Sequence, residues 1–140
     1  MGFPDRIERT MDLEHPIERV WEALTTAEGL AGWFGTTAEI DLRPGGKGDL
    51  YFADHDLHGP FEVRVIEPPT RFAFNWHVPG LPDDDPRRTF VEFTLEKTAS
   101  GTRLTLVESG FAQMPEGMFE ANTRGWPIKL AELGQYLDAA

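Results

Sequence analysis

The spacing of the apolar residues changes twice along this chain, and that change is the strongest constraint on its fold. From Thr36 to Gly110 apolar residues recur at every second position, in short runs separated by turns rich in Gly, Pro and Asp. In residues 16–33 and again after Gly110 they recur every three or four residues. Strict alternation is typical of strands with one buried face, and short turns pair neighbouring strands in antiparallel order. The central region is therefore predicted to form a meander of six strands.

A seventh strand and two short helices are predicted ahead of the meander. Residues 7–13 alternate imperfectly and are expected to form the strand. Residues 16–24 have apolar positions at helical spacing, with Pro16 as the first helical residue, where its missing N–H costs nothing. Thr26 is expected to cap a second helix that ends near Trp33.

A long helix is predicted at the C-terminal end, over residues 115–137. Its apolar stripe consists of Phe119, Trp126, Leu130, Leu133 and Leu137. Pro127 lies inside it and is expected to kink the helix or to split it in two. A helix with one apolar stripe needs a sheet to pack against. The predicted fold is therefore α+β: a helix-grip fold in which a curved seven-stranded antiparallel sheet wraps around a long C-terminal helix, with two short helices between the first and second strands.

Length and charge limit the classes of partner. No linker or repeat divides the 140 residues, so one domain is predicted over residues 1–140. The 24 acidic and 13 basic residues give a formal charge of −11, which repels phosphate backbones and anionic lipid, so neither a nucleic-acid nor a membrane partner is predicted. The sequence has no cysteine and no apolar run of about 18 residues. The first residues lack the pattern of a secretory signal, and a cytoplasmic location is expected.

Seven short motifs occur along the chain in the order expected of one known superfamily. They are HPIERVWEAL (15–24), WF (33–34), RPGG (43–46), EPP (67–69), FAFNW (72–76), GTRLTL (101–106) and GW (125–126). On these motifs the chain resembles the SRPBCC superfamily, also called START-like or Bet v 1-like. Within it, the chain is similar to the branch that contains the C-terminal domain of the activator of the heat-shock protein 90 ATPase. The resemblance covers residues 7–137.

The resemblance implies a seven-stranded sheet around the C-terminal helix with a cavity between them. Members of the superfamily mostly bind hydrophobic small molecules, and a few act as cyclases, hydrolases or lyases. The eukaryotic co-chaperone has a separate N-terminal domain that does not occur in these 140 residues, which counts against chaperone activation. Typical members have a small residue at the position of Phe61, so the pocket is expected to be partly filled here.

Large aromatic residues supply most of the candidate pocket. A strongly curved sheet is not filled by one helix, so some rings are expected to face a void suited to an apolar ligand with one polar group. The candidate pocket residues are Trp33, Phe34, Phe52, Phe61, Phe74, Trp76, Phe93, Glu108, Trp126 and Leu130. We expect Trp76 and Trp126 in the wall, with their indole N–H groups oriented toward the ligand. The alternative is that the rings fill a core and touch only one another.

The strand register predicts the positions of two polar residues, Glu108 and His77. Glu108 shares the alternation of Leu104 and Leu106, and a carboxyl group on an apolar face must be paired, protonated or close to water. One interpretation is that Glu108 is a polar anchor for a ligand in the pocket and could act as a general base. The alternative is that it forms an ion pair or lies in solvent near the end of the strand. His77 falls on the face opposite Trp76 and is expected at the surface.

No catalytic residue, metal site or cofactor is predicted. The segment DHDLH (54–58) alternates carboxylates and imidazoles, but it lies in a hairpin turn, and catalytic zinc needs three ligands held by further hydrogen bonds, so a solvated turn is favoured. The acidic segment 83–85 is interpreted as a solvated loop, with a lid over the cavity as the alternative. The sequence also lacks Gly-x-Ser-x-Gly and a glycine-rich phosphate loop.

The leading functional hypothesis is the binding of a hydrophobic or aromatic small molecule in a cavity between the sheet and the C-terminal helix. One alternative is a protein-interaction module, similar to the co-chaperone domain, with a chaperone as partner. Another is a cyclase- or hydrolase-type enzyme that uses the same pocket. The oligomeric state is left open, with a homodimer among the alternatives.

Overall fold

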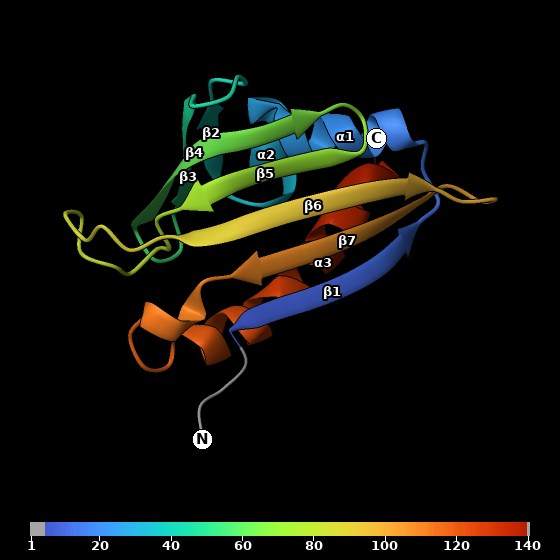
Figure 1. Cartoon of the computed structure of the whole chain (residues 1–140). Helices are drawn as coiled ribbons and strands as arrows, with labels where there is room; N and C mark the ends of the chain where they lie inside the picture. Colours follow the sequence, from blue (N-terminus) through green and yellow to red (C-terminus); the bar gives the residue numbers. More distant parts are fainter. Residues whose placement is uncertain (1–4, 140) are drawn as a thin grey trace.

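The computed structural model describes residues 5–139, in which three α-helices pack against one face of a seven-stranded sheet (Figure 1). The elements in chain order are β1 (Arg6–Leu13), α1 (Ile17–Thr25), α2 (Ala27–Trp33), β2 (Thr37–Ile40), β3 (Lys47–Phe52), β4 (Leu57–Glu67), β5 (Arg71–Trp76), β6 (Thr89–Lys97), β7 (Thr102–Ser109), the 3₁₀ turn η1 (Phe111–Gln113) and α3 (Met118–Ala139).

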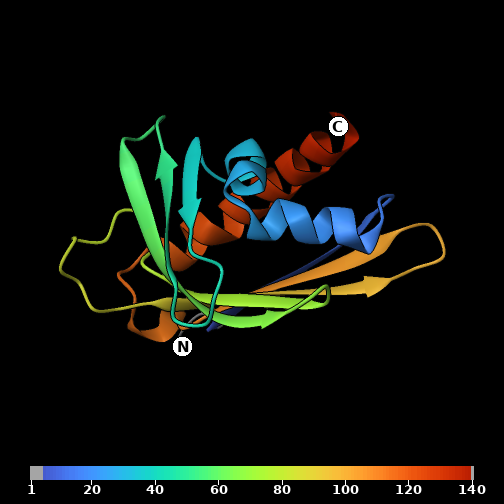
Figure 2. The ribbon, with the colours of Figure 1, turned by 90° about the horizontal axis from the view of Figure 1, so that it is seen from above.

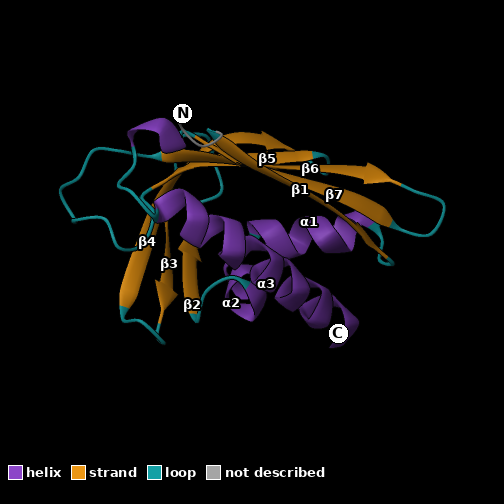
Figure 3. Cartoon of the chain, turned by 90° about the horizontal axis from the view of Figure 1, so that it is seen from below, coloured by secondary structure: helices purple, strands orange, loops and turns teal. Residues whose placement is uncertain are grey.

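All neighbouring strands are antiparallel, in the order β1-β7-β6-β5-β4-β3-β2. Strands β2 to β7 follow one another as a meander, and β1 joins the free edge of β7. The half of the sheet formed by β2, β3 and β4 turns away from the other half, so that the sheet curves around the helices (Figure 3). The predicted α+β helix-grip fold is therefore confirmed, including the two short helices between the first two strands.

The first of the two short helices begins one residue later than predicted, whereas the second begins where it was expected. Pro16 is the N-cap of α1, not its first residue, and its carbonyl accepts the backbone N–H groups of Arg19 and Val20. The predicted cap of α2 is confirmed, because Thr26 Oγ1 accepts the backbone N–H of Gly29 at 2.9 Å. This cap starts α2 directly after α1, so that the end of α2 reaches the concave face of the sheet (Figure 2).

Strand β4 departs from simple alternation. It begins at Leu57, inside the segment predicted to be a turn, and a bulge between Val63 and Val65 shifts its pairing with β5. As a result Ile66, rather than Val65, lies opposite Phe72 and packs against the core. An extra residue in one strand reverses the face of every residue that follows it.

Helix α3 is continuous from Met118 to Ala139, so Pro127 does not split it. Its buried residues are Trp126, Leu130, Leu133 and Leu137, which form the predicted stripe. The prediction had included Phe119, which is half-buried, and had begun the helix at Pro115. Among the described residues no helix has the length and apolar character needed to cross a membrane.

Candidate functional site

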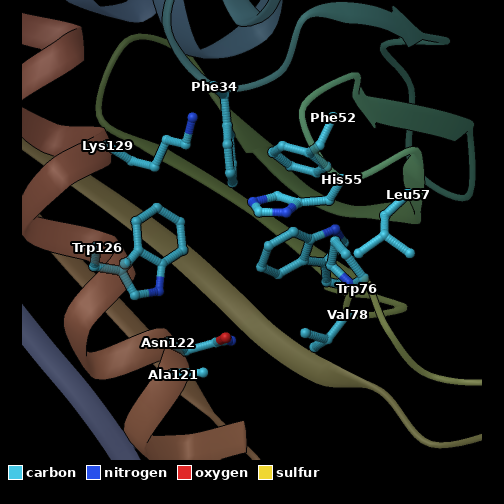
Figure 4. A pocket seen from close by; sticks show the side chains of 12 residues that line it. Phe34, Phe52, His55, Leu57, Trp76, Val78, Ala121, Asn122, Trp126 and Lys129 are labelled. Atoms are coloured by element: carbon cyan, nitrogen blue, oxygen red, sulfur yellow. The ribbon is translucent and has the colours of Figure 1, made fainter.

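An apolar pocket of about 320 Å³ lies between α3 and the end of the sheet where β5 stops and β3 turns into β4 (Figure 4). Three polar side chains reach it, those of His55, Asn122 and Lys129. The rest of the wall is apolar: Phe34, Phe52, Leu57, Trp76, Val78, Pro79, Ala121, Gly125 and Trp126. The lining therefore comes from four separate parts of the chain that only the tertiary fold brings together.

Three aromatic rings form the deep part of the wall. The ring centroid of Phe34 lies 5.3 Å from that of Trp126 and 5.5 Å from that of Trp76, and the two indoles are 6.3 Å apart. All three side chains are buried. Phe34 reaches this place because it is the C-cap of α2, directly after the last helical turn. Such tilted arrangements are favourable for aromatic pairs, so the wall is a stable unit without a ligand.

The indole N–H groups of this wall are already used inside the protein. Trp76 Nε1 donates to the carbonyl of Gly59 at 3.2 Å, and Trp126 Nε1 donates to Glu108 Oε1 at 2.8 Å. The expectation that they orient a polar atom of a ligand is therefore wrong. Gly59 is needed for the first contact, because a Cβ at that position would lie 2.7 Å from Trp76 Nε1.

Glu108 is fully buried behind the pocket wall. Its Oε1 accepts hydrogen bonds from Trp126 Nε1 and, at 3.0 Å, from Asn122 Nδ2, whereas its Oε2 accepts from Thr89 Oγ1 at 2.7 Å. Among the described residues no cation forms an ion pair with it. Of the alternatives left open by the sequence, neither the ion pair nor the solvated strand end occurs. The carboxyl group contacts the pocket through Trp126 and Asn122 rather than directly.

Burial raises the pKa of Glu108 above its ordinary value, since the charged form loses its hydration. The hydrogen bonds from Thr89, Trp126 and Asn122 oppose this rise because they favour the carboxylate, but burial is the larger effect. Glu108 is thus a buried carboxyl group whose three hydrogen bonds only partly offset its loss of hydration.

The polar residues of the pocket lie on its rim and its helical side. Lys129 Nζ pairs with Glu132 Oε2 at 3.0 Å and lies 5.7 Å from the centroid of the Phe52 ring. His55 belongs to the turn between β3 and β4 and is exposed. Asn122 projects from α3 toward the side of the pocket formed by Val78 (Figure 4).

Of the ten candidate residues, the structure places four in this pocket wall and six outside it. The four are Phe34, Phe52, Trp76 and Trp126. The six are Trp33, Phe61, Phe74, Phe93, Glu108 and Leu130, all of which are buried in the protein interior.

Specific contacts hold several of these six in the core. Trp33 stacks on Phe34 with centroids 4.8 Å apart, but its Nε1 donates to the carbonyl of Ala23 at 2.8 Å. Phe61 lies over Gly48 on the next strand, where a Cβ would meet its ring at 2.2 Å. The ring of Phe61 therefore covers a glycine of β3 instead of narrowing the pocket.

Sequence reasoning missed the pocket residues that come from loops and from the polar side of α3. Val78 and Pro79 follow β5, and His55 and Leu57 belong to the turn that had been interpreted as solvated. The only sequence signal for the helical ones is their spacing: Ala121, Asn122, Gly125 and Lys129 share one face of α3 with Trp126.

Hydrogen bonds within the loop after β5, and from it to the segment before α3, hold this loop in place. His77 is 3% exposed, not at the surface as expected, since its Nε2 contacts the carbonyl of Pro82 at 2.8 Å within the same loop. Asp85 accepts several hydrogen bonds from Arg87, which lower the pKa of that carboxyl to about 2. Arg87 also donates to the carbonyl of Gln113 at 2.8 Å. The loop that carries Val78 and Pro79 is thereby tied to the segment before α3.

The 54–58 segment is an exposed turn and strand start whose side chains form hydrogen bonds with residues of β3. His58 Nδ1 lies 2.6 Å from Asp49 Oδ2, a contact that raises the pKa of His58, and Tyr51 Oη donates to Asp56 at 2.8 Å. Within residues 5–139 no cluster of three or more potential ligands is arranged to hold a metal ion.

Comparison with known proteins places this arrangement in a family. The family model described as "Activator of Hsp90 ATPase homolog 1-like protein" matches residues 14–138. A comparison with curated proteins finds no match.

Solved structures with the same fold come from several sources. Protein MLL2253 from Mesorhizobium loti is 28% identical, with 96% of this chain and 98% of that chain covered and a TM-score of 0.84. DynU16, a protein in the dynemicin biosynthetic locus, is 26% identical with a TM-score of 0.82. The match covers 96% of this chain but only 48% of DynU16. The Aha1 dimer from Colwellia psychrerythraea is 21% identical, with 94% and 95% covered and a TM-score of 0.76, a likeness that concerns the fold alone.

Proposed function

The chain belongs to the family of Activator of Hsp90 ATPase homolog 1-like proteins, and on that premise we propose that it binds a hydrophobic or aromatic small molecule in the pocket between α3 and the sheet. The observation that carries the proposal is the pocket of about 320 Å³ itself, whose deep wall consists of Phe34, Trp76 and Trp126. This volume is at the lower end of the range of small-molecule sites, about 300–1,000 Å³, and suits a ligand of one or two fused rings.

The wall is organised before any ligand arrives. Each indole donates its N–H to a buried acceptor, and the rings of Phe34, Trp76 and Trp126 pack against one another. A ligand that enters such a site has few side chains to immobilise, so more of its burial energy appears as affinity. The likeness to a protein in the dynemicin biosynthetic locus agrees with a role that involves a small molecule.

One glycine of α3 allows the pocket to be filled without disturbing the fold, and a second glycine of the same helix offers a matched control. A Cβ added at Gly125, which lines the pocket, meets nothing within 4 Å, and the same holds for Gly134, which lies outside the pocket. Gly125→Leu should therefore place its side chain in the cavity, whereas Gly134→Leu makes the same chemical change elsewhere on the helix. Both replace a helical glycine, which favours the helix by about 0.5–1 kcal/mol.

The test is a titration of each protein with Prodan, a neutral naphthalene dye whose emission shifts to shorter wavelength in apolar surroundings. We expect micromolar binding by the unchanged protein and by Gly134→Leu, and a loss of at least tenfold in affinity for Gly125→Leu, with melting temperatures equal or higher. Equal binding by all three proteins would place the dye elsewhere. If the unchanged protein binds no apolar probe, the proposed function is wrong.

The family description supports a second candidate, an interaction with a chaperone of the Hsp90 type. It is tested by adding the purified protein to such a chaperone and measuring ATP hydrolysis. Stimulation that Gly125→Leu leaves unchanged would indicate a surface interaction independent of the pocket. The homodimer and the cytoplasmic location stay predictions, and sedimentation equilibrium checks the first.

A further inference from the structure

We propose that the pocket selects neutral aromatic molecules that carry a hydrogen-bond donor, such as a phenolic hydroxyl group, and that Asn122 Oδ1 is the acceptor that recognises it. This inference deepens the proposed function and rests on it. It follows from the way in which Glu108 orients the amide of Asn122.

Glu108 Oε1 can be satisfied only by donors. It already accepts from Trp126 Nε1 at 2.8 Å, and its contact with the Asn122 side chain is 3.0 Å. A carbonyl oxygen of Asn122 at that place would face a buried oxygen without a proton between them, so the amide must present its NH₂ group. The same orientation holds when Glu108 is protonated on Oε2, because Thr89 Oγ1, 2.7 Å away, can then accept that proton and Oε1 still needs donors.

The fixed amide leaves its oxygen for the pocket. Asn122 lines the pocket, and Figure 4 shows the tip of its side chain directed from α3 into the space in front of Val78. In the described part of the chain, His77 Nδ1 is the one fully buried side-chain polar atom without a partner. Asn122 Oδ1, for which no protein donor is found either, is therefore accessible to a ligand or to water.

Three other polar groups of the pocket do not compete for this role. The N–H groups of Trp76 and Trp126 are occupied, and Lys129 is paired with Glu132 at the rim. An anionic ligand group in front of Asn122 would meet the lone pairs of Oδ1 with Glu108 behind them, in a protein of formal charge −11. A neutral hydrogen-bond donor avoids both the repulsion by these lone pairs and the repulsion by the negative charge, so a phenol fits better than a carboxylate.

Calorimetric titration with three matched probes tests the inference: 2-naphthol, 2-methoxynaphthalene and naphthalene. We expect 2-naphthol to bind about 5- to 10-fold more tightly than 2-methoxynaphthalene, the worth of one net hydrogen bond. In Asn122→Leu this ratio should fall to about one, whereas a preference caused by the size of the methoxy group would persist in that variant.

Glu108 is a positioning residue in this scheme, and its variants separate orientation from packing. Glu108→Gln keeps an acceptor for Asn122 and Trp126 and should retain the preference for 2-naphthol. Glu108→Leu releases the amide and should lose the preference while still binding naphthalene. If Glu108→Leu does not fold, the comparison of Asn122→Leu with the unchanged protein decides alone.

Equal affinity of the unchanged protein for 2-naphthol and 2-methoxynaphthalene would overturn the donor selectivity and leave the proposed function intact. A preference that survives in Asn122→Leu would overturn the role of Asn122. Failure of all three probes to bind, together with failure of Prodan, would instead reject the proposed function.

Discussion

Replacing Glu108 by leucine tests how far the core depends on one buried acceptor. Thr89 and Trp126 donate to it and are 1% and 3% exposed, so their donors cannot turn to water, whereas Asn122 can do so through the pocket. Two buried donors left without an acceptor cost about 1–3 kcal/mol each. Apolar burial of the leucine returns about 1–2 kcal/mol. We expect the free energy of unfolding to fall by about 2–3 kcal/mol.

The assay is unfolding by urea at pH 7, followed by tryptophan fluorescence and by circular dichroism. Glu108→Gln is the matched control, since its oxygen can accept from Trp126 and Asn122 and its NH₂ group can donate to Thr89. That variant should stay within about 1 kcal/mol of the unchanged protein. If Glu108→Leu is as stable as Glu108→Gln, the two buried donors do not depend on this acceptor and the reasoning fails.

The pH dependence supplies a second check on the same residue. The pKa of Glu108 is raised in the folded protein, so its favourable contribution is complete below the unfolded value, near 4.5, and is lost as the pH rises through the folded pKa. Glu108→Gln does not titrate at this position. The difference in stability between the two proteins should therefore shift in favour of Glu108→Gln as the pH rises above about 4.5 and then level off. A constant difference from pH 4 to pH 8 would contradict burial of an ionisable carboxyl.

Three further changes test other parts of the structure. Gly59→Ala should displace the indole of Trp76, costing about 1–3 kcal/mol and weakening Prodan binding, as urea unfolding and dye titration would show; unchanged values would mean that the contact is loose. Thr26→Ala removes the N-cap of α2 and should cost about 1 kcal/mol in urea unfolding, with Thr26→Ser as the control that retains the cap. Asp85, whose pKa is lowered by Arg87 to about 2, contributes stability above its ordinary value of 3.8 that is lost as the pH falls through 2. The melting temperature of Asp85→Asn should therefore lie below that of the unchanged protein at pH 7 and approach it near pH 2.

The elements and their order could be predicted from the sequence because both depend on local spacing. Alternation identified β2 to β7, the helical stripe identified α3, and Thr26 marked the start of α2. The same register correctly put Glu108 on the inner face with Leu104 and Leu106. Side-chain direction along a regular element repeats with a fixed period, so sequence alone determines which face a residue occupies as long as the element stays regular.

The regularity itself is broken by features that have no such period. Because of the bulge in β4, Ile66 rather than Val65 lies on the inner face of the sheet. The loop after β5 folds over His77 and buries it. Both depend on contacts with a neighbouring strand or with the loop's own backbone. The sequence pattern contains no record of these contacts.

The division of the aromatic residues between core and pocket was likewise decided by the tertiary structure. Trp33 and Phe34 are adjacent in the chain, yet only Phe34 lines the pocket, because the N–H of Trp33 bonds to α1. The ring of Phe61 packs over Gly48 of the neighbouring strand β3. The sequence determined that large rings would gather inside a curved sheet around a helix. Which of them faces the empty space depends on partners distant in the chain, whose positions exist only once the sheet has closed around α3.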